Sequence, residues 1–246
     1  MSGAASPKIF SAGRPNLTPL SSPEPYVQVW LAHLDSILTN EIERFFGALD
    51  RSERTRAEKL RSEQDRHRYI AAHSLLRLVL GEALGCRANA IVLETSPDGK
   101  PQLRSSEHGK RLLKFNLSHA GGWALIATGW DRELGVDLES AESLPDDDES
   151  LSKLAARILS KRELETWDTT PTAAKRRVKF LRVWTRKEAY VKATGEGLRQ
   201  DLANIDLPED ATPFNVSSAK RPADHWIVHD LSVPVELTAA LAVEAC

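Results

Sequence analysis

The order of the expected elements is the sequence feature that most restricts how this chain can fold. In the first half, alternating apolar residues at 26–30 predict a strand, helical patterns follow up to 63–84, and further strands come next. The second half repeats this order, from a strand at 134–139 through a long helical pattern at 170–193 to a terminal hairpin. The halves meet near 129–133. This repeated order predicts an α+β chain of two similar lobes related by a pseudo-twofold.

Two long helices with buried stripes are expected, one in each lobe. The first is bounded by Gly85, a typical C-terminal stop. The second is expected to begin at Thr170 and Pro171, a cap followed by a first-turn proline, and to end at Thr194 and Gly195. Its apolar stripe comprises Val178, Leu181, Trp184 and Val191.

The composition excludes several classes of protein. Lys and Arg number 33 against 35 Asp and Glu, so the net charge of −2 lacks the basic excess that general nucleic-acid binding requires. No run of about 18 apolar residues is present, so we expect no membrane span. The two cysteines, Cys86 and Cys246, are too few for a disulfide framework or a cysteine-rich zinc site.

The chain start is read as a flexible leader over 1–25, because it is rich in Ser and Pro and has no apolar signal segment. The expected lobes are 26–131 and 132–246, and the expected compartment is the cytoplasm. The acidic run 145–149 is expected to be a solvated loop.

Asp137 and Glu139 stand two apart in an expected strand, so their side chains leave the same face. Neighbouring carboxylates repel each other, which is costly unless water or a cation lies between them. On these two residues alone, a solvent-facing strand edge is the favoured interpretation. A cation site is the alternative.

Glu188 and Lys192 lie one turn apart on the second long helix, and Glu188 follows Trp184 by four residues. This places a carboxylate on an otherwise apolar stripe, where it needs a partner. The alternative without a functional role is a surface Glu–Lys pair, which stabilises a helix by a few tenths of a kcal/mol.

Residues suited to binding an anion occur in two further segments. Lys100 stands in a turn that Gly99 and Pro101 help to fix, and Ser118 and His119 end a strand before a Gly–Gly break. Together with the carboxylates they suggest a site for Mg²⁺ and phosphate, because Mg²⁺ combines a few carboxylates with substrate phosphates. The chain has no Walker or GxGxxG loop and no His/Cys cluster with zinc spacing.

Four motifs occur in a specific order: Gly99-Lys-Pro101, Phe115-Asn-Leu-Ser-His119, Gly135-Val-Asp-Leu-Glu139, and Trp184 to Lys192 followed by Gly195-Glu-Gly-Leu198. This ordered set resembles the 4′-phosphopantetheinyl transferase superfamily, in its long, surfactin-type branch. The resemblance implies two α+β lobes with the active site in the cleft between them. It also implies transfer of the phosphopantetheine arm of coenzyme A to a serine of an acyl or peptidyl carrier protein.

The resemblance also assigns roles to residues. Asp137, Glu139 and Glu188 are the implied Mg²⁺ ligands, with Glu188 the candidate for activating the carrier serine and Lys192 for neutralising charge on the phosphates. The implied contacts with coenzyme A come from residues of both lobes: Arg56 (with Arg54 as its alternative), Gly99, Lys100, Pro101, Asn116, Ser118, His119 and Lys192. Ala120 departs from the pattern, because the family often has Ser or Thr there.

Other functions remain open at this stage. A non-catalytic module that binds coenzyme A or a carrier protein could keep the same fold, and a metal-dependent phosphohydrolase could use the same cleft. The paired carboxylates and lysine favour the transferase. A two-lobed chain can build the site alone, so we expect a monomer.

Overall fold

The computed structural model describes residues 16–97, 99–104, 111–197, 201–207, 214–215 and 225–245. The described strands form two four-stranded antiparallel sheets and a small hairpin. Within the described residues, no helix combines the length and apolar character needed to cross a membrane.

The first sheet has the strand order β1-β2-β6-β5. Its strands are β1 (Thr18–Leu20), β2 (Val27–His33), β5 (Leu113–Ala120) and β6 (Trp123–Trp130). The helices of this half are α1 (Thr39–Phe46), α2 (Arg51–Lys59) and α3 (Glu63–Leu84), and a hairpin of β3 (Leu93–Thr95) and β4 (Pro101–Leu103) follows.

The second sheet has the order β7-β10-β9-β8. Its strands are β7 (Leu134–Ser140), β8 (Phe214–Asn215), β9 (His225–Leu231) and β10 (Leu237–Glu244). The helices of this half are α4 (Asp148–Ile158), α5 (Lys161–Asp168) and α6 (Ala173–Thr194). The expected fold of two similar α+β lobes is therefore confirmed.

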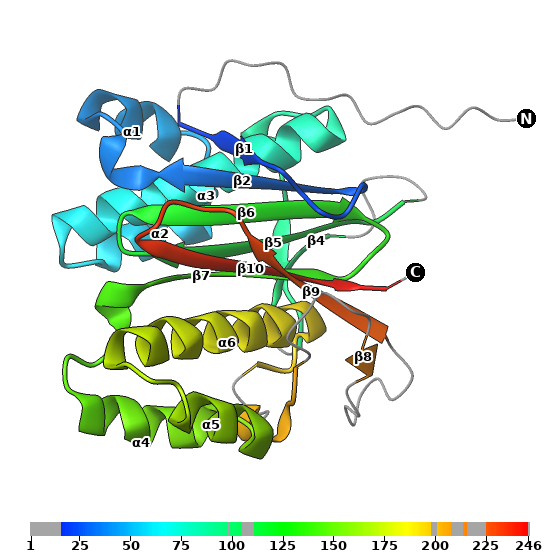
Figure 1. The fold of residues 1–246 in the computed structure, drawn as a ribbon. Coiled ribbons are helices and arrows are strands. Elements are labelled where there is room, and N and C mark those ends of the chain that lie inside the picture. Colours follow the sequence, from blue (N-terminus) through cyan, green and yellow to red (C-terminus); the bar gives the residue numbers. More distant parts are fainter. Residues whose placement is uncertain are drawn as a thin grey trace, which may run out of the picture.

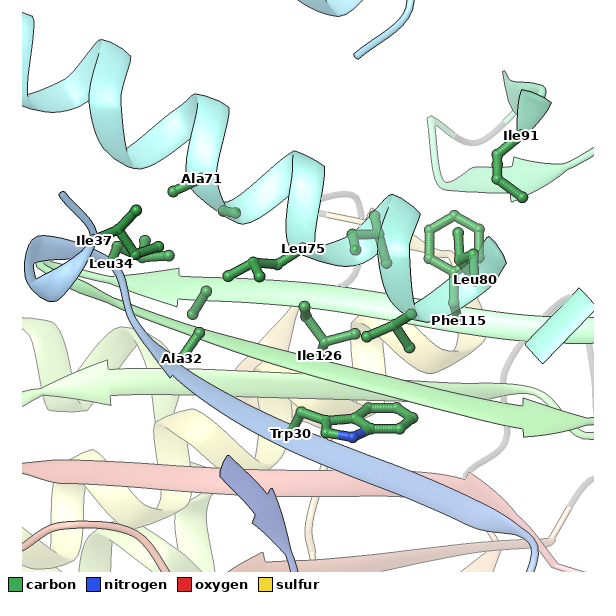
Figure 2. Close-up of a cluster of buried hydrophobic side chains, with 14 of the residues drawn as sticks. Trp30, Ala32, Leu34, Ile37, Ala71, Leu75, Leu80, Ile91, Phe115 and Ile126 are labelled. Atoms are coloured by element: carbon green, nitrogen blue, oxygen red, sulfur yellow. The ribbon is translucent and has the colours of Figure 1, made fainter. Parts of the chain in front are cut away.

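The two sheets pack against each other, and each carries a long helix on its outer face (Figure 1). Between the sheets, Val29 and Leu125 of the first half share one apolar cluster with Val136 and Leu241 of the second. On the outer face of the first sheet, Leu75 of α3 packs with residues of β2, β5 and β6 (Figure 2). Helix α6 packs on the outer face of the second sheet through a separate cluster.

The bounds of α3 agree with the expectation, because its end signals are local. Ser62 caps its first turn by accepting from the Asp65 backbone N–H, and Gly85 closes it in the left-handed region at φ 69°. Such signals can be read from a few neighbouring residues. Strand β1, by contrast, lies inside the range expected to be a flexible leader, and residues 1–15 lie outside the described part.

Three expectations for the second half were wrong in detail. Helix α6 begins at Ala173, because Thr172 rather than Thr170 caps it. The acidic run is a loop only in part, because Asp147 caps α4 and Asp148 begins it. Val178, expected in the buried stripe of α6, is 68% exposed. In this half of α6, Leu181 rather than Val178 belongs to the buried cluster shared with α4 and α5.

Gly135 allows α6 to approach β7 very closely. A Cβ atom at this position would lie 2.3 Å from both the Ala189 carbonyl oxygen and the Ala193 backbone nitrogen. These are backbone atoms of a buried helix, so they cannot turn aside as a side chain could. Lys192 lies between Ala189 and Ala193 in the sequence, so the glycine determines how close Lys192 comes to β7.

We expect Gly135→Ala to lower the free energy of unfolding by about 1–3 kcal/mol or more, because overpacking displaces backbone. Gly129→Ala is the matched control, since its Cβ would meet side-chain atoms first, Leu134 Cδ2 at 2.8 Å and Val27 Cγ2 at 3.3 Å. Urea unfolding curves of both variants measure the difference. An equal loss in the two would contradict the role given to Gly135.

Candidate functional site

The edges of the two sheets meet along a seam between β5 and β7, which lie side by side (Figure 1). Asn116 Oδ1 of β5 accepts a hydrogen bond from the Val136 backbone N–H of β7 at 2.9 Å. Ser118 Oγ accepts one from the Leu138 N–H at 3.2 Å. Two short polar side chains of the first lobe therefore hold the edge strand of the second.

Asp137 lies at the centre of this seam and is only 2% exposed. Its Oδ1 accepts hydrogen bonds from Lys192 Nζ at 2.6 Å and from Ser118 Oγ at 3.0 Å. Lys192 Nζ also donates to Ser118 Oγ at 2.9 Å. Side chains from β5, β7 and α6 thus meet at one point, so the interpretation of Asp137 as a solvent-facing edge residue was wrong.

The second oxygen of this carboxylate fits a metal ligand. Asp137 Oδ2 is buried and has no hydrogen-bond donor among the residues that the structure describes. A buried acceptor left without a partner costs free energy, so its position calls for an explanation. A cation bound during function would provide one.

The donor set fits Mg²⁺ only together with a substrate. Across the described ranges, no group of three or more His, Cys, Asp or Glu side chains is placed to hold a metal ion. Mg²⁺ is usually bound by one or two carboxylates and completes its shell with waters and substrate phosphates. The seam therefore offers a partial shell that a phosphate oxygen would complete.

Glu139 and Glu188 add negative charge near Asp137. Burial, followed by the charge of Asp137, raises the pKa of Glu139 to about 7. The same two causes raise the pKa of Glu188, and Lys192 opposes them. Ser143 Oγ donates to Glu139 Oε2 at 3.1 Å. The carboxylates therefore repel each other, and a bound cation would lower the cost of keeping them charged.

A cavity of about 330 Å³ lies between α2, α3 and the strands β3 to β5. Four of the residues predicted to contact coenzyme A line it: Arg56, Pro101, Asn116 and His119. Burial, and then the positive charge of Lys192, lower the pKa of His119. The cavity thus lies on the first-lobe side of the seam that holds Lys192.

Arg56 and its predicted alternative Arg54 have different surroundings. Arg56 lines this cavity, with its guanidinium 5.9 Å from the centre of the Tyr69 ring. Arg54 lies over the Phe46 ring and donates to the Gly47 carbonyl oxygen at 3.2 Å. The geometry therefore favours Arg56 as the cavity arginine.

Lys100 does not line the 330 Å³ cavity. It lines a second cavity of about 410 Å³ between β4, β5 and the end of α6. Its ammonium donates to the carbonyl oxygens of Ala193 and Leu134 and to Glu133 Oε2. Gly99 adopts a φ of 90° in the turn before it, as turn chemistry suggests.

Two cavity residues were missed by the sequence reasoning. The Tyr69 and His73 rings stack at 4.1 Å and line the cavity beside Arg56. His73 also lies 3.3 Å from Glu53 Oε1, and burial raises the pKa of Tyr69 to about 12. They stand four apart on α3, so the helical spacing could have placed them on one face.

Comparison with known proteins identifies the family. Residues 133–243 match the profile of the 4′-phosphopantetheinyl transferase superfamily, and residues 36–131 match that of the 4′-phosphopantetheinyl transferase N-terminal region. The chain is 33% identical to the 4′-phosphopantetheinyl transferase HetI of Nostoc sp., over 93% of this chain and 91% of that protein. The chain therefore belongs to the 4′-phosphopantetheinyl transferase superfamily.

Two further relatives agree with this assignment. The putative 4′-phosphopantetheinyl transferase slr0495 of Synechocystis sp. is 30% identical, over 82% of this chain and 78% of that protein. The L-aminoadipate-semialdehyde dehydrogenase-phosphopantetheinyl transferase of Xenopus laevis is 31% identical, over 61% of this chain and 50% of that protein.

The raised pKa values of Glu139 and Glu188 predict how stability depends on pH. Between about pH 4.5 and about pH 7, the Glu139 carboxyl binds more protons in the folded metal-free chain than in the unfolded chain, and the raised pKa of Glu188 acts in the same direction. The contribution of these two carboxyls to stability should therefore fall as the pH rises. Glu139→Gln should therefore raise the melting temperature at pH 8, and the gain should disappear near pH 4.5. Thermal unfolding at a series of pH values measures this.

Glu142→Gln, at an exposed neighbouring position, is the control and should leave the pH profile unchanged. Added Mg²⁺ should stabilise wild type most at pH 8, where the carboxylates are charged. A Glu139→Gln variant with the pH slope of wild type would contradict the repulsion inferred here.

Proposed function

We propose that this protein transfers the 4′-phosphopantetheine arm of coenzyme A to a serine of an acyl or peptidyl carrier protein. The observation that carries the proposal is the seam, where one oxygen of the buried Asp137 accepts no hydrogen bond from any described residue and lies beside Lys192 and Ser118. In a member of this superfamily, such a group is suited to hold a cation and a phosphate. The carrier serine forms a bond to the β-phosphorus, and adenosine 3′,5′-bisphosphate leaves.

Asp137 and Glu188 are the proposed Mg²⁺ ligands, with Glu139 as a third. When bound, Mg²⁺ would neutralise charge on the pyrophosphate and orient it. Asp137 Oδ2 is suited to this task because its partner oxygen already accepts from Lys192 and Ser118, which fixes the carboxylate plane. Lys192 and Ser118 thus both donate to Asp137 Oδ1, and this orients Oδ2, the proposed ligand oxygen.

Glu188 is the proposed base for the carrier serine. Its pKa is raised by burial and by Asp137, which makes its carboxylate a better proton acceptor than an exposed glutamate. The serine proton passes to this carboxylate as the new P–O bond forms. Lys192 stabilises the charge that develops on the departing phosphate oxygen.

The 330 Å³ cavity is the proposed site for the nucleotide end of coenzyme A. Arg56 offers a cation at its wall, and His119 offers a ring whose lowered pKa would rise again next to a phosphate. Pro101 and Asn116 form parts of the same wall, while Gly99 and Ser118 fix the turn and strand beside it. Lys100 does not line this cavity and is therefore left out of the proposed nucleotide site.

A non-catalytic module that binds coenzyme A or a carrier protein is the alternative. Binding alone does not require a buried carboxylate oxygen to which no described residue donates, so the seam favours transfer. We also propose that the protein acts in the cytoplasm. We propose in addition that it acts as a monomer, because one chain supplies Ser118, Asp137 and Lys192 from both lobes. Light scattering of the purified protein would test the monomeric state.

One incubation separates transfer from its alternatives. Purified protein is mixed with coenzyme A, Mg²⁺ and an apo carrier protein, and the carrier is examined by mass spectrometry. A mass gain of one phosphopantetheine arm supports transfer. An unchanged carrier with intact coenzyme A supports the binding module, and free phosphopantetheine supports a hydrolase.

We expect Asp137→Asn to reduce kcat by ~100-fold or more, because it removes the charge needed for Mg²⁺ while keeping the side-chain volume. Circular dichroism checks that the fold is retained, and Ser143→Ala is a control that removes the hydroxyl donor to Glu139 rather than a proposed ligand. Near-normal turnover of Asp137→Asn at saturating Mg²⁺ would show that the metal assignment is incorrect.

Glu188→Gln and Lys192→Ala should each lower kcat by ~100-fold or more, since one removes the base and the other a charge near the leaving oxygen. The double variant should lose less than the product of the two losses, because both groups act in one transition state. Single-turnover kinetics of the three variants measures this. A purely multiplicative loss would indicate that the residues act independently.

A further inference from the structure

The ammonium of Lys100 connects the first lobe to the end of α6 in the second. Lys100 belongs to the turn of the β3–β4 hairpin, where the Ser96 backbone N–H donates to its carbonyl oxygen at 2.9 Å. Ser96 Oγ accepts from the Lys100 N–H at 3.1 Å. The backbone of Lys100 is therefore held from both sides before its side chain leaves the hairpin.

The side chain of Lys100 reaches two elements of the other lobe. Nζ donates to the Ala193 carbonyl oxygen in the last turn of α6 at 2.9 Å and to the Leu134 carbonyl oxygen in β7 at 3.1 Å. It also forms an ion pair with Glu133 Oε2 at 3.1 Å. An ammonium has three N–H donors, and these three acceptors of the described residues lie within hydrogen-bonding distance of it.

A cation at this position stabilises the last turn of α6. The final four carbonyl groups of a helix lack partners within the helix, and its C-terminal end carries partial negative charge. Gly195 closes α6 with φ 74° by donating to the Val191 carbonyl oxygen, which leaves the Ala193 carbonyl to another donor. Lys100, whose side chain is 17% exposed, supplies it.

The same turn carries the site lysine. Ala193 directly follows Lys192, whose Nζ lies 2.6 Å from Asp137 Oδ1, and Leu134 precedes Asp137 by three residues on β7. By donating to both carbonyls, Lys100 joins the two backbones that carry the ion pair. A shift of the last turn of α6 relative to β7 would separate Lys192 from Asp137.

We propose that Lys100 is a positioning residue that fixes the last turn of α6 on β7 and thereby aligns Lys192 with Asp137, instead of binding the nucleotide end of coenzyme A. This inference rests on the proposed transfer function. The side chain needed for this role is the ammonium, since the carbonyl oxygens it binds are acceptors.

Lys100→Met tests the proposal, because Met keeps an unbranched apolar side chain and removes the ammonium. Lys114→Met is the matched control: Lys114 pairs with the same Glu133, at 2.6 Å on its other oxygen. We expect Lys100→Met to lower kcat at least 10-fold with KM for coenzyme A within about 2-fold of wild type. Lys114→Met should leave both within about 2-fold.

Two further readouts separate positioning from substrate binding. The ratio of kcat/KM for coenzyme A to that for dephospho-coenzyme A should be unchanged in Lys100→Met, because the side chain would not contact the 3′-phosphate. Hydrogen exchange of the amides at 191–195 should become faster in Lys100→Met than in Lys114→Met. This exchange needs neither substrate nor turnover.

A KM for coenzyme A raised at least 10-fold with normal kcat, or a lost preference for the 3′-phosphate, would overturn the proposal in favour of a substrate contact. Unchanged exchange at 191–195 would also overturn it. If Lys100→Met did not fold, Lys100→Gln, which keeps a hydrogen-bond donor, would be subjected to the same measurements. If wild type failed to modify any carrier, the transfer function would be refuted, whereas the exchange experiment would still decide the role of Lys100.

Discussion

The close approach of α6 to β7 at Gly135 is the constraint on which the candidate site depends. Helix and strand backbones touch there without an intervening side chain, and this brings Lys192 within hydrogen-bonding distance of Asp137. Backbone contacts vary less than contacts between long side chains, so the distance between the two functional groups is set by the fold itself. Lys100 then fixes the free end of the same helix.

The electrostatics of the site follow from this packing. Burial raises the pKa values of Asp137, Glu139 and Glu188, and the charge of Asp137 raises those of Glu139 and Glu188 further. One ammonium, that of Lys192, opposes the three. A site of this kind is unfavourable for the folded chain alone and becomes favourable when a cation and a phosphate enter, which is the pattern expected for functional rather than structural groups.

The sequence alone was sufficient to predict those helices and strands whose boundaries are marked by neighbouring residues. The end of helix α3 was predicted from Gly85, and the terminal hairpin from its alternating residues, because caps and period-two patterns involve near neighbours. The ordered motifs likewise pointed to Asp137 and Lys192 as site residues, and the structure brings these two together. Their roles in the reaction remain predictions.

The sequence alone was insufficient to predict the burial of residues that are covered by segments far away in the sequence. Asp137 and Glu139 taken alone favoured an exposed strand edge, because nothing nearby in sequence shows that β5 lies along β7. Lys187 is completely buried in an ion pair with Glu163 of α5, although the one-stripe description of α6 gave no reason to expect it. The C-terminal half of α6 is covered on several sides, so a single stripe could not describe it.

The apolar cluster between the sheets also determines how the molecule unfolds. The cluster contains Val29 and Leu125 from one lobe and Val136 and Leu241 from the other, so both lobes contribute to this core. Separating the lobes would expose an apolar face on each sheet, at a cost of about 25 cal/mol for every Å² uncovered. We therefore expect the two lobes to unfold as one cooperative unit, so that calorimetry of the whole chain shows a single transition in which both lobes melt together.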